Sequence, residues 1–575
     1  MQSAPFVPWA SVLAGWAAVG ALLYGLGCLV TRWLSPAPDE PTGSLVRFWL
    51  GWSAALGVLQ LWHFALPIDG RVYLALGPLG ALGLFGHRAA LLESARRAMT
   101  TARGALGAAA VALVAACAAA LALHRPCNPD SCLYHVATIR WFEQYPIVPG
   151  LGHVHLRLAF NHAYYLYASL FDVGSLRGHG EHLANGLLLL GVLGPACLLL
   201  PGVVDVRRPQ PNSSYLTVAL AGVTLDLLFG CNLSSPTADV AVATTGAILI
   251  LLAVGPAIDG AELTPFRLRA IGLIAMAAVI AKPAAVIVAA PFTLYAAAEA
   301  LRGQGARGTW PRTAGVLAIA AIALVVPWLV RGAVLSGYPL FPSEVADLGL
   351  PWRLPAGVGH RELLYERAFA RLRADADFTG DYAWVRHWLS LEWLENREFV
   401  IPAATLVLAG SLAAVLALRQ RRQLPMARSA AAVAAALVVW WVLAPDPRFA
   451  MPLIWCAAVL AALFALELMP WRTAVAPRAA RALLALAVVA GAFAEPWRIS
   501  LPFAKDFETA GPERFAEGRL GSGEAVRIFR GCCLDPTCVF GDPADLYLRR
   551  RGDFSSGFCS GAGCNESPRS LASPQ

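Results

Sequence analysis

Charged residues are scarce in this chain, and their scarcity excludes an ordinary soluble domain. They make up 14% of the 575 residues, whereas soluble globular domains carry about 25%. The alternating ten-residue segments typical of outer-membrane barrels are absent as well. Hydrophobic residues make up 58% and gather in long runs. Because a run of about 20 apolar residues matches the hydrocarbon thickness of a bilayer, these runs predict an all-α bundle of transmembrane helices.

Common catalytic and nucleotide-binding motifs are missing too. The sequence contains no Walker A string, no Gly-x-Gly-x-x-Gly after a strand, no His-Glu-x-x-His and no Ser-His-Asp order of a hydrolase. No basic segment precedes the first apolar run, so we expect a permanent first helix rather than a cleaved signal peptide. The net charge is +8, but the basic residues lie in short loops where membrane insertion explains them, so no nucleic-acid partner is expected.

The apolar runs predict a polytopic bundle of about 14 spans. Two short runs meet at Lys282-Pro283, and because one kinked helix cannot hold both, a helical hairpin is expected there. The runs centre on residues 9–33, 45–66, 72–87, 104–124, 183–204, 215–233, 237–255, 267–281, 284–301, 313–335, 398–418, 429–445, 448–468 and 480–496.

Arginine clusters indicate which loops face the cytoplasm. The positive-inside rule places basic loops there, and the predicted spans bring all five clusters to one side. The clusters lie at residues 88–103, 207–208, 302–312, 419–428 and 472–481. The segments 125–182, 336–397 and 497–575 are then extracytoplasmic, and so are both termini.

Cysteines concentrate in these external segments. Seven of the twelve lie there, which predicts disulfides in an oxidising compartment, with a zinc site as the weaker alternative. The expected pairs join Cys127 to Cys132, and Cys532 or Cys533 to Cys538, Cys559 or Cys564. The chain thus divides into N-terminal transmembrane helices 1–103, a core 104–496 and a small external C-terminal segment 497–575.

Asp130 lies just outside the run that ends near Leu123. A carboxylate at the boundary between membrane and water is partly desolvated, which makes it a stronger base. Such a group suits a general base that deprotonates an incoming hydroxyl. The alternative is an N-cap for a helix that starts at Ser131, and the sequence leaves both roles open.

The rest of the first external loop is too polar to span a membrane and too aromatic for a flexible linker. Residues 131–145 and 158–171 predict two interfacial helices that lie along the membrane, separated by prolines and glycines. The aromatic side chains of this loop suit the headgroup layer. They are Trp141, Tyr145, Tyr164, Tyr165 and Tyr167.

Histidines also crowd this loop. His135, His153, His155 and His162 surround Arg157. His153 and His155 diverge on a helix, so polar anchoring is expected rather than a metal site. The planar fork of donors on Arg157 suits a phosphate or carboxylate.

Ionisable residues at the external ends of spans are further candidates, because charges near the membrane plane are costly. These residues are Lys282, Arg331, Asp446 and Arg448. Lys282 and Arg448 can bind a lipid phosphate, with snorkelling to the headgroups as the alternative. Asp226 and Asp239 face a pore or pair with a neighbouring arginine.

The second external loop, 336–397, mixes tryptophans with charged residues. This composition suits a lid over a substrate groove, with aromatic faces for a sugar or lipid. The alternative is an ordinary interfacial cap with a solvated charged helix at 360–374.

Three strings resemble a family of uncharacterised bacterial multi-pass proteins. The first combines Asp130, Tyr134 and His135 with Val-Pro-Gly-Leu at 148–151 and Val-His-Leu-Arg-Leu-Ala-Phe-Asn at 154–161. The others lie at 327–342, which includes Arg331, and at 445–449. This resemblance implies a bacterial inner-membrane protein.

The layout of the chain, with an Asp near the start of the first large external loop, resembles the GT-C glycosyltransferase superfamily. Its members transfer a sugar from a polyprenyl-phosphate carrier. The resemblance implies Asp130 as the catalytic base, and a set of substrate-binding residues: Tyr134, His135, His155, Arg157, Asn161, Lys282, Arg331, Asp446 and Arg448. Ser131 follows Asp130 where several relatives have Glu, and about three extra spans precede the loop. The serine weighs against a metal-dependent version, so no cofactor is expected.

Three functions are compatible with this sequence. The first is an inverting transferase that moves the sugar to an extracytoplasmic glycan or lipid acceptor. The second is a transporter or flippase of a lipid-linked or anionic solute, and the third is a non-catalytic assembly protein. Transporters often show inverted repeats and midplane charges. Here no convincing repeat is found and the charges cluster at one face, which favours the enzyme.

Overall fold

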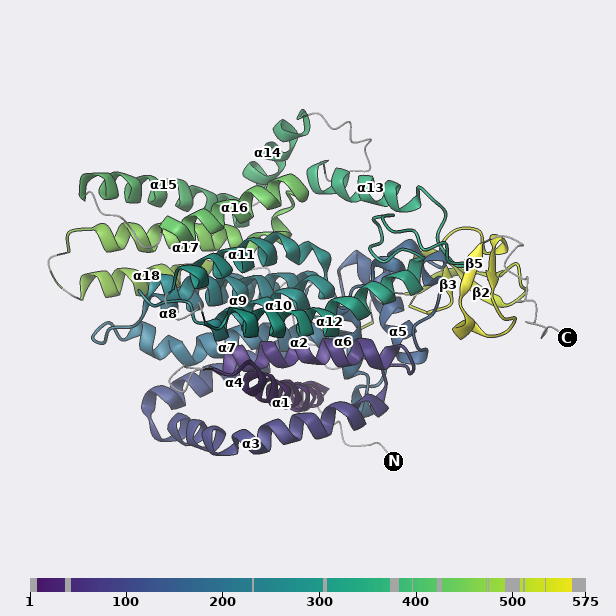
Figure 1. The fold of residues 1–575 in the computed structure, drawn as a ribbon, viewed down its shortest axis with the longest axis horizontal. Helices are drawn as coiled ribbons and strands as arrows, with labels where there is room; N and C mark the ends of the chain where they lie inside the picture. The colour runs from purple at the N-terminus through teal and green to yellow at the C-terminus, as the bar shows by residue number, and fades with distance from the viewer. Residues whose placement is uncertain are drawn as a thin grey trace.

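Each of the fourteen predicted apolar runs coincides with a helix in the computed structural model. Most of these helices lie side by side along the long axis of the molecule (Figure 1). Their bounds are α1 Pro8–Leu34, α2 Ser44–His63, α3 Tyr73–Thr100, α4 Ala102–Leu121, α7 Ala184–Val204, α8 Asn212–Phe229, α9 Asp239–Ile258, α10 Pro265–Ala281, α11 Val286–Arg302, α12 Trp310–Ser336, α15 Arg397–Gln420, α16 Ala427–Leu443, α17 Met451–Leu468 and α18 Ala476–Gly491.

The structure describes most of the chain. The described residues are 8–36, 43–229, 232–303, 308–372, 382–395, 397–420, 427–471, 473, 475–491, 507–509, 512–532 and 534–560. Within these ranges, ten helices are long and apolar enough to cross a membrane. The protein is therefore a multi-pass helical membrane protein, and the full count of about 14 spans stays a prediction.

Close helix packing explains how so many apolar segments form one bundle. α9 is almost wholly buried and lies at the centre, against α7, α8, α10, α11 and α17. α1 and α2 approach each other so closely that a Cβ on Gly51 would lie 1.7 Å from the Leu23 carbonyl oxygen. Small residues permit such contact between membrane helices. The predicted hairpin at Lys282-Pro283 is present, since α10 ends at Ala281 and packs against α11.

The first external loop contains one of its two predicted helices. A π-helical turn, η2 (Ser131–His135), leads directly into α5 (Val136–Gln144), as expected for 131–145. The second prediction, 158–171, is wrong as a single helix, because the chain forms η4 (Leu156–Phe160), α6 (Tyr164–Ala168) and η5 (Ser169–Phe171). Asn161 breaks it with a left-handed φ of 51°. This residue is held by Trp328, whose carbonyl accepts from Asn161 Nδ2 at 2.6 Å and whose Nε1 donates to the Asn161 carbonyl at 2.8 Å.

Most aromatic residues of this loop lie inside the protein rather than among headgroups. Trp141, Tyr164, Tyr165 and Tyr167 are all buried, and Tyr164 donates to Asn185 Oδ1 at 2.6 Å. The headgroup assignment is therefore wrong for these four residues. An aromatic ring with one polar atom suits a membrane interface and a hydrogen-bonded protein interior equally well.

The second external loop contains two helices, α13 (Val358–Leu372) and α14 (Trp384–Glu395). α13 matches the charged helix predicted at 360–374. Trp388 is buried, and its Nε1 donates to the Pro445 carbonyl at 2.6 Å. Short 3-10 turns connect the remaining elements: η1 Gly70–Val72, η3 Leu151–His153, η6 Gly174–Leu176, η7 Gly180–His182, η8 Pro283–Ala285, η10 Pro447–Phe449, η12 Pro543–Asp545 and η13 Phe554–Ser556.

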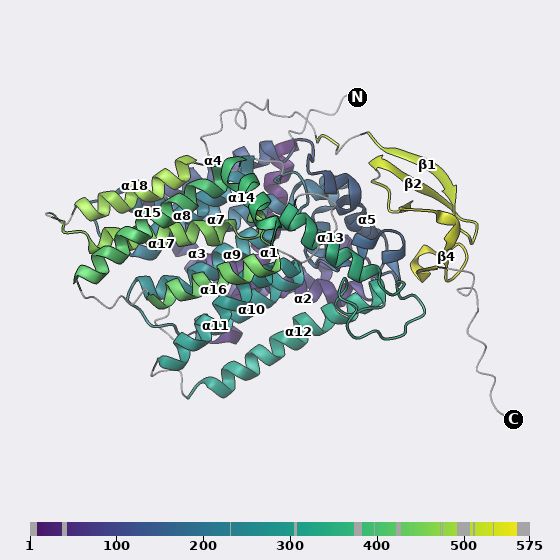
Figure 2. The ribbon, with the colours of Figure 1, turned by 90° about the horizontal axis from the view of Figure 1, so that it is seen from above.

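The C-terminal segment is a small β structure, so the all-α class holds only for the helical part. Its strands are β1 Arg514–Arg519, β2 Ala525–Cys532, β3 Cys538–Val539, β4 Leu546–Leu548 and β5 Phe558–Ser560. β1 pairs antiparallel with β2, β3 pairs parallel with β2, and β4 pairs antiparallel with β5. The strands lie at one end of the bundle beside α5 (Figures 1 and 2).

At least one disulfide forms in the external segments, as predicted, but it joins different partners. Cys132 of the first loop is bonded to Cys532 of β2. The expected pairing of Cys132 with Cys127, and of Cys532 within the tail, is therefore wrong. Cys127, Cys538 and Cys559 are also disulfide-bonded, whereas Cys533 and Cys564 lie outside the described residues. The free cysteines among the described residues all lie in long helices: Cys28, Cys117, Cys197 and Cys456.

Three carboxylates of the first loop surround Arg140. Arg140 contacts Glu143 at 3.0 Å, Glu181 at 3.3 Å and Asp172 at 3.6 Å. Burial raises the pKa of Glu143 to about 8, because one guanidinium does not offset both desolvation and two neighbouring carboxylates. The folded state therefore favours the protonated form of Glu143.

Protonated Glu143 therefore contributes to the stability of the folded state. This contribution should be complete below the ordinary pKa of a glutamate and should disappear as the pH rises to about 8. We expect the melting temperature of Glu143→Gln to rise relative to that of the wild type between about pH 5 and pH 8. The difference between the two proteins isolates Glu143 from the buried histidines His135 and His162, whose lowered pKa values act in the opposite direction. Thermal unfolding in detergent at a series of pH values measures both melting temperatures. An equal pH dependence in the two proteins would show that Glu143 is not the group responsible.

Candidate functional site

A cavity of about 640 Å³ opens where the two external loops meet the ends of the helices. Seven separate stretches of the chain line it. They are residues 128–135, residues 157–162, Asp239 at the start of α9, residues 282–284 after α10, residues 341–342, residues 363–370 of α13, and residues 443–449. Its volume falls in the range of about 300–1,000 Å³ that is usual for ligand sites.

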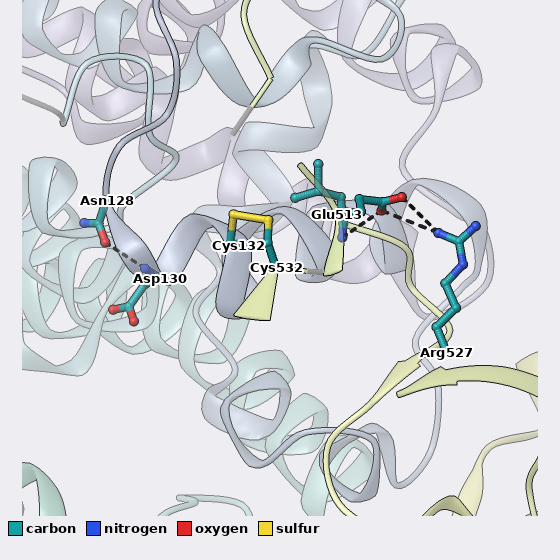
Figure 3. Close-up of a disulfide and its surroundings, with 7 residues drawn as sticks. Asn128, Asp130, Cys132, Glu513, Arg527 and Cys532 are labelled. Carbon is teal, nitrogen blue, oxygen red and sulfur yellow. Dashed lines mark hydrogen bonds and ion pairs between the residues drawn. A yellow bond between two sulfur atoms is a disulfide. The ribbon is translucent and has the colours of Figure 1, made fainter. Parts of the chain in front are cut away.

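Asp130 faces this cavity from the start of η2. Its backbone N–H donates to Asn128 Oδ1 at 3.0 Å (Figure 3). Its carboxylate is 33% exposed and accepts from Arg157 Nη1 at 3.0 Å. Although Asp130 occupies the N-cap position, its side chain makes no capping hydrogen bond to the helix that follows. The capping alternative is therefore wrong, and this carboxylate is available at the cavity wall.

Arg157 lies beside Asp130 and connects the two external loops. Besides Asp130 it contacts Glu362 of α13, with 3.7 Å between Nε and Oε1. Its guanidinium lies over the rings of Tyr134 and Tyr365, at 5.5 and 5.8 Å. A cation that is held by several partners at a cavity wall is well placed to exchange one of them for a ligand anion.

Lys282 and Asp239 form a second ion pair on the cavity wall. Lys282 Nζ lies 2.5 Å from Asp239 Oδ1, and each side chain is 17% exposed. The ammonium also lies 5.2 Å from the ring centre of Phe449. Of the alternatives left open for Asp239, pairing is correct, but the partner is a lysine. Lys282 turns inward to this carboxylate rather than snorkelling to the headgroups.

Arg448 supplies a third cation to the cavity. Its Nε lies 2.8 Å from Asp446 Oδ2, and its backbone N–H donates to Asp446 Oδ1 at 3.1 Å. Asp446 is completely buried and does not line the cavity. It therefore fixes the position of Arg448 without facing the cavity itself. Although burial opposes the charge on Arg448, the carboxylates of Asp446 and Asp239 raise its pKa above the ordinary value.

The histidines at this site are uncharged at neutral pH. His135 and His162 line the cavity. Burial, reinforced by nearby Lys282, lowers the pKa of His162 to about 3 and lowers that of His135 as well. His155 is partly buried, and desolvation lowers its pKa to about 3. An anion in the cavity would therefore meet arginine and lysine rather than imidazolium.

Six of the ten predicted site residues line the cavity. They are Asp130, Tyr134, His135, Arg157, Lys282 and Arg448. Asp446 is the buried partner of Arg448. The other three have structural contacts elsewhere. His155 packs against Phe540 with 3.9 Å between ring centres, and Asn161 bonds Trp328. Arg331 is fully buried beside His63 at 2.7 Å.

The face of α13 is the part of the site that sequence reasoning missed. Tyr365, Glu366 and Phe369 line the cavity, and Glu362 contacts Arg157. Positions 362, 365, 366 and 369 fall on one face of a helix, because residues three and four apart are neighbours. This spacing is visible in the sequence and could have identified the face of α13 that lines the cavity. Among the described residues, no group of three His, Cys, Asp or Glu side chains has the arrangement of a metal site.

Comparisons with known proteins place the chain in a family whose description gives no activity. No curated protein and no solved structure matches this chain. The model of a family described as "Domain of unknown function (DUF8201)" matches residues 10–455. The match includes nearly all of α1, all of α2 and α3, and every lining residue of the cavity. It ends before the C-terminal strands. Because the match spans most of its length, the chain belongs to this DUF8201 family.

Proposed function

We propose that this protein is an inverting membrane glycosyltransferase, similar in layout to the GT-C superfamily. It would move a sugar from a polyprenyl-phosphate donor to an extracytoplasmic glycan or lipid acceptor. The observation that supports this proposal is one shared cavity for Asp130, Arg157, Lys282 and Arg448. Among the charged residues of the cavity wall, Asp130 would provide a base for the acceptor, and these three cations would provide an anion site for the donor.

The proposed reaction is a single displacement at the anomeric carbon. The acceptor hydroxyl oxygen forms a bond to that carbon while the bond from the carbon to the phosphate oxygen breaks. Asp130 takes the hydroxyl proton, and the polyprenyl phosphate leaves with the electron pair. Because negative charge develops on the phosphate, Arg157, Lys282 and Arg448 would stabilise the transition state more than the ground state.

The remaining cavity wall suits the two parts of such a donor. Tyr365 and Phe369 offer aromatic faces for a sugar ring. The cavity wall also includes the apolar side chains of Phe341, Leu363 and Leu443, which suit the first isoprene units. Neither feature requires a cofactor.

The proposal needs the cavity to face the extracytoplasmic side of a bacterial inner membrane. We expect a thiol-reactive, membrane-impermeant label to modify Ala544→Cys in intact spheroplasts, but not Ala95→Cys at the arginine-rich end of α3. Both alanines are exposed, so accessibility differs only by side of the membrane. Labelling at position 95 alone would reverse the orientation and would rule out an external role for Asp130.

The transfer itself is tested with purified protein in lipid vesicles. Incubation with a polyprenyl-phosphate donor carrying a radiolabelled sugar, and a mixture of membrane glycans as acceptor, should release unlabelled polyprenyl phosphate. Movement of intact donor across the vesicle membrane, without loss of its sugar, would instead support the transporter.

A further inference from the structure

The C-terminal segment is covalently attached next to the cavity. The disulfide between Cys132 and Cys532 joins η2 to the end of β2, across 400 residues of sequence (Figure 3). Cys132 is two residues from Asp130 and lies in the same helical stretch. A bond at this point therefore restrains the backbone that presents the Asp130 carboxylate to the cavity.

The same segment also contacts the residues that precede Arg157 in the first external loop. The Phe540 backbone N–H donates to the Val154 carbonyl at 3.0 Å, and the Phe540 ring contacts His155. His155 Nδ1 in turn accepts from the Arg157 backbone N–H at 3.2 Å. Phe540 directly follows β3 and stacks on Phe529 of β2 with 4.1 Å between ring centres, so both attachments come from the same small β segment.

A third set of contacts joins the C-terminal segment to the first external loop. The Phe558 backbone N–H donates to the Pro149 carbonyl at 2.9 Å, and the Phe558 ring lies 5.8 Å from that of Trp141. The backbones approach so closely that a Cβ on Gly150 would lie 2.2 Å from the Phe558 carbonyl oxygen. This close approach leaves no space for the first external loop to shift relative to the C-terminal segment.

We propose that the C-terminal β segment is a clamp that positions the Asp130–Arg157 pair. Each member of the pair is two residues from an attachment point, Cys132 for Asp130 and His155 for Arg157. Cys132, Cys532 and Phe540 are positioning residues, since none of the three lines the cavity. Fixing both flanks sets the separation of a base and a phosphate-binding cation, and small misplacements of such groups reduce rates strongly. The clamp does not depend on which ligand the cavity binds.

The test is local hydrogen exchange in the full-length protein in lipid nanodiscs, without any substrate. In Cys532→Ser, amide exchange at residues 126–135 should rise about tenfold, while the long helices exchange as in the wild type. Phe540→Ala should raise exchange at 153–158 instead. Cys197→Ser removes a free thiol and is the matched control, with no expected change.

Two results would overturn the clamp. One is unchanged exchange at residues 126–135 in Cys532→Ser. The other is an equal rise throughout the helices, which would indicate a general loss of stability. If Cys532→Ser does not accumulate, Phe540→Ala decides the matter, because it leaves every disulfide in place. Unchanged exchange at residues 153–158 in that variant would then overturn the clamp. Because no activity is measured, the clamp and the glycosyltransferase can fail independently.

Discussion

Asp130→Asn should lower sugar transfer by about 10²–10⁴-fold, the usual contribution of a positioned general base. Asparagine keeps the shape of the side chain and can still accept a hydrogen bond from Arg157, but it cannot take a proton. Since Asp130 makes no capping bond, the change should leave folding and abundance nearly unaltered. The measurement is the rate of transfer from a labelled donor by purified variants at matched concentration.

The matched control for this substitution is Asp542→Asn. Asp542 is exposed on the tail and caps η12 by accepting from the Ala544 backbone N–H, and asparagine caps a helix about as well as aspartate. The control should retain wild-type transfer. Wild-type transfer by Asp130→Asn would remove the main support for an enzyme and would favour the transporter.

Lys282→Met should destabilise the protein by about 3–5 kcal/mol, because it leaves the carboxylate of Asp239 buried without its partner. The pair is close and mostly buried, so the cost comes from the unpaired charge rather than from lost packing. Adding Asp239→Asn to this variant removes that charge and should restore most of the stability. Unfolding of the single and double variants in mixed detergent micelles gives the coupling between the two residues.

A Lys282→Met protein as stable as the wild type would contradict the close pairing of Lys282 and Asp239. The lysine would then be a mobile cation, and its role at the cavity would rest on ligand binding alone. A double variant less stable than both single variants would likewise show that the two side chains have other partners.

The helical part of the fold could be predicted because a long apolar run in a membrane satisfies its backbone hydrogen bonds within the segment, as a helix does. The fourteen runs, and the turn at Lys282-Pro283, needed no knowledge of tertiary contacts. Polar residues at the ends of these runs were also informative, since a charge near a membrane needs a partner or a function. Asp130, Lys282 and Arg448 were found in this way, and they share one cavity with Arg157, which was predicted from the donor geometry of its guanidinium.

The parts that could not be predicted depend on contacts between distant segments. α13 has the composition of a solvated helix. The spacing of its residues 362, 365, 366 and 369 marks one face, but only the contact of Glu362 with Arg157 shows that this face is covered. Asn161 and Arg331 resemble site residues by sequence, but Trp328 and His63 engage them in the protein interior. Disulfide connectivity cannot be deduced from spacing, and the bond from Cys132 to Cys532 spans two external segments.

The most direct test of the proposed function is a density map of the protein with a polyprenyl-phosphate analogue. The proposal predicts phosphate density within hydrogen-bond distance of at least two of Arg157, Lys282 and Arg448. The first isoprene units should lie along Phe341 and Leu443, and the carboxylate of Asp130 should face the phosphate across the space for a sugar. An empty cavity at saturating analogue, or a phosphate bound elsewhere on the protein, would contradict the assignment of this cavity as the donor site.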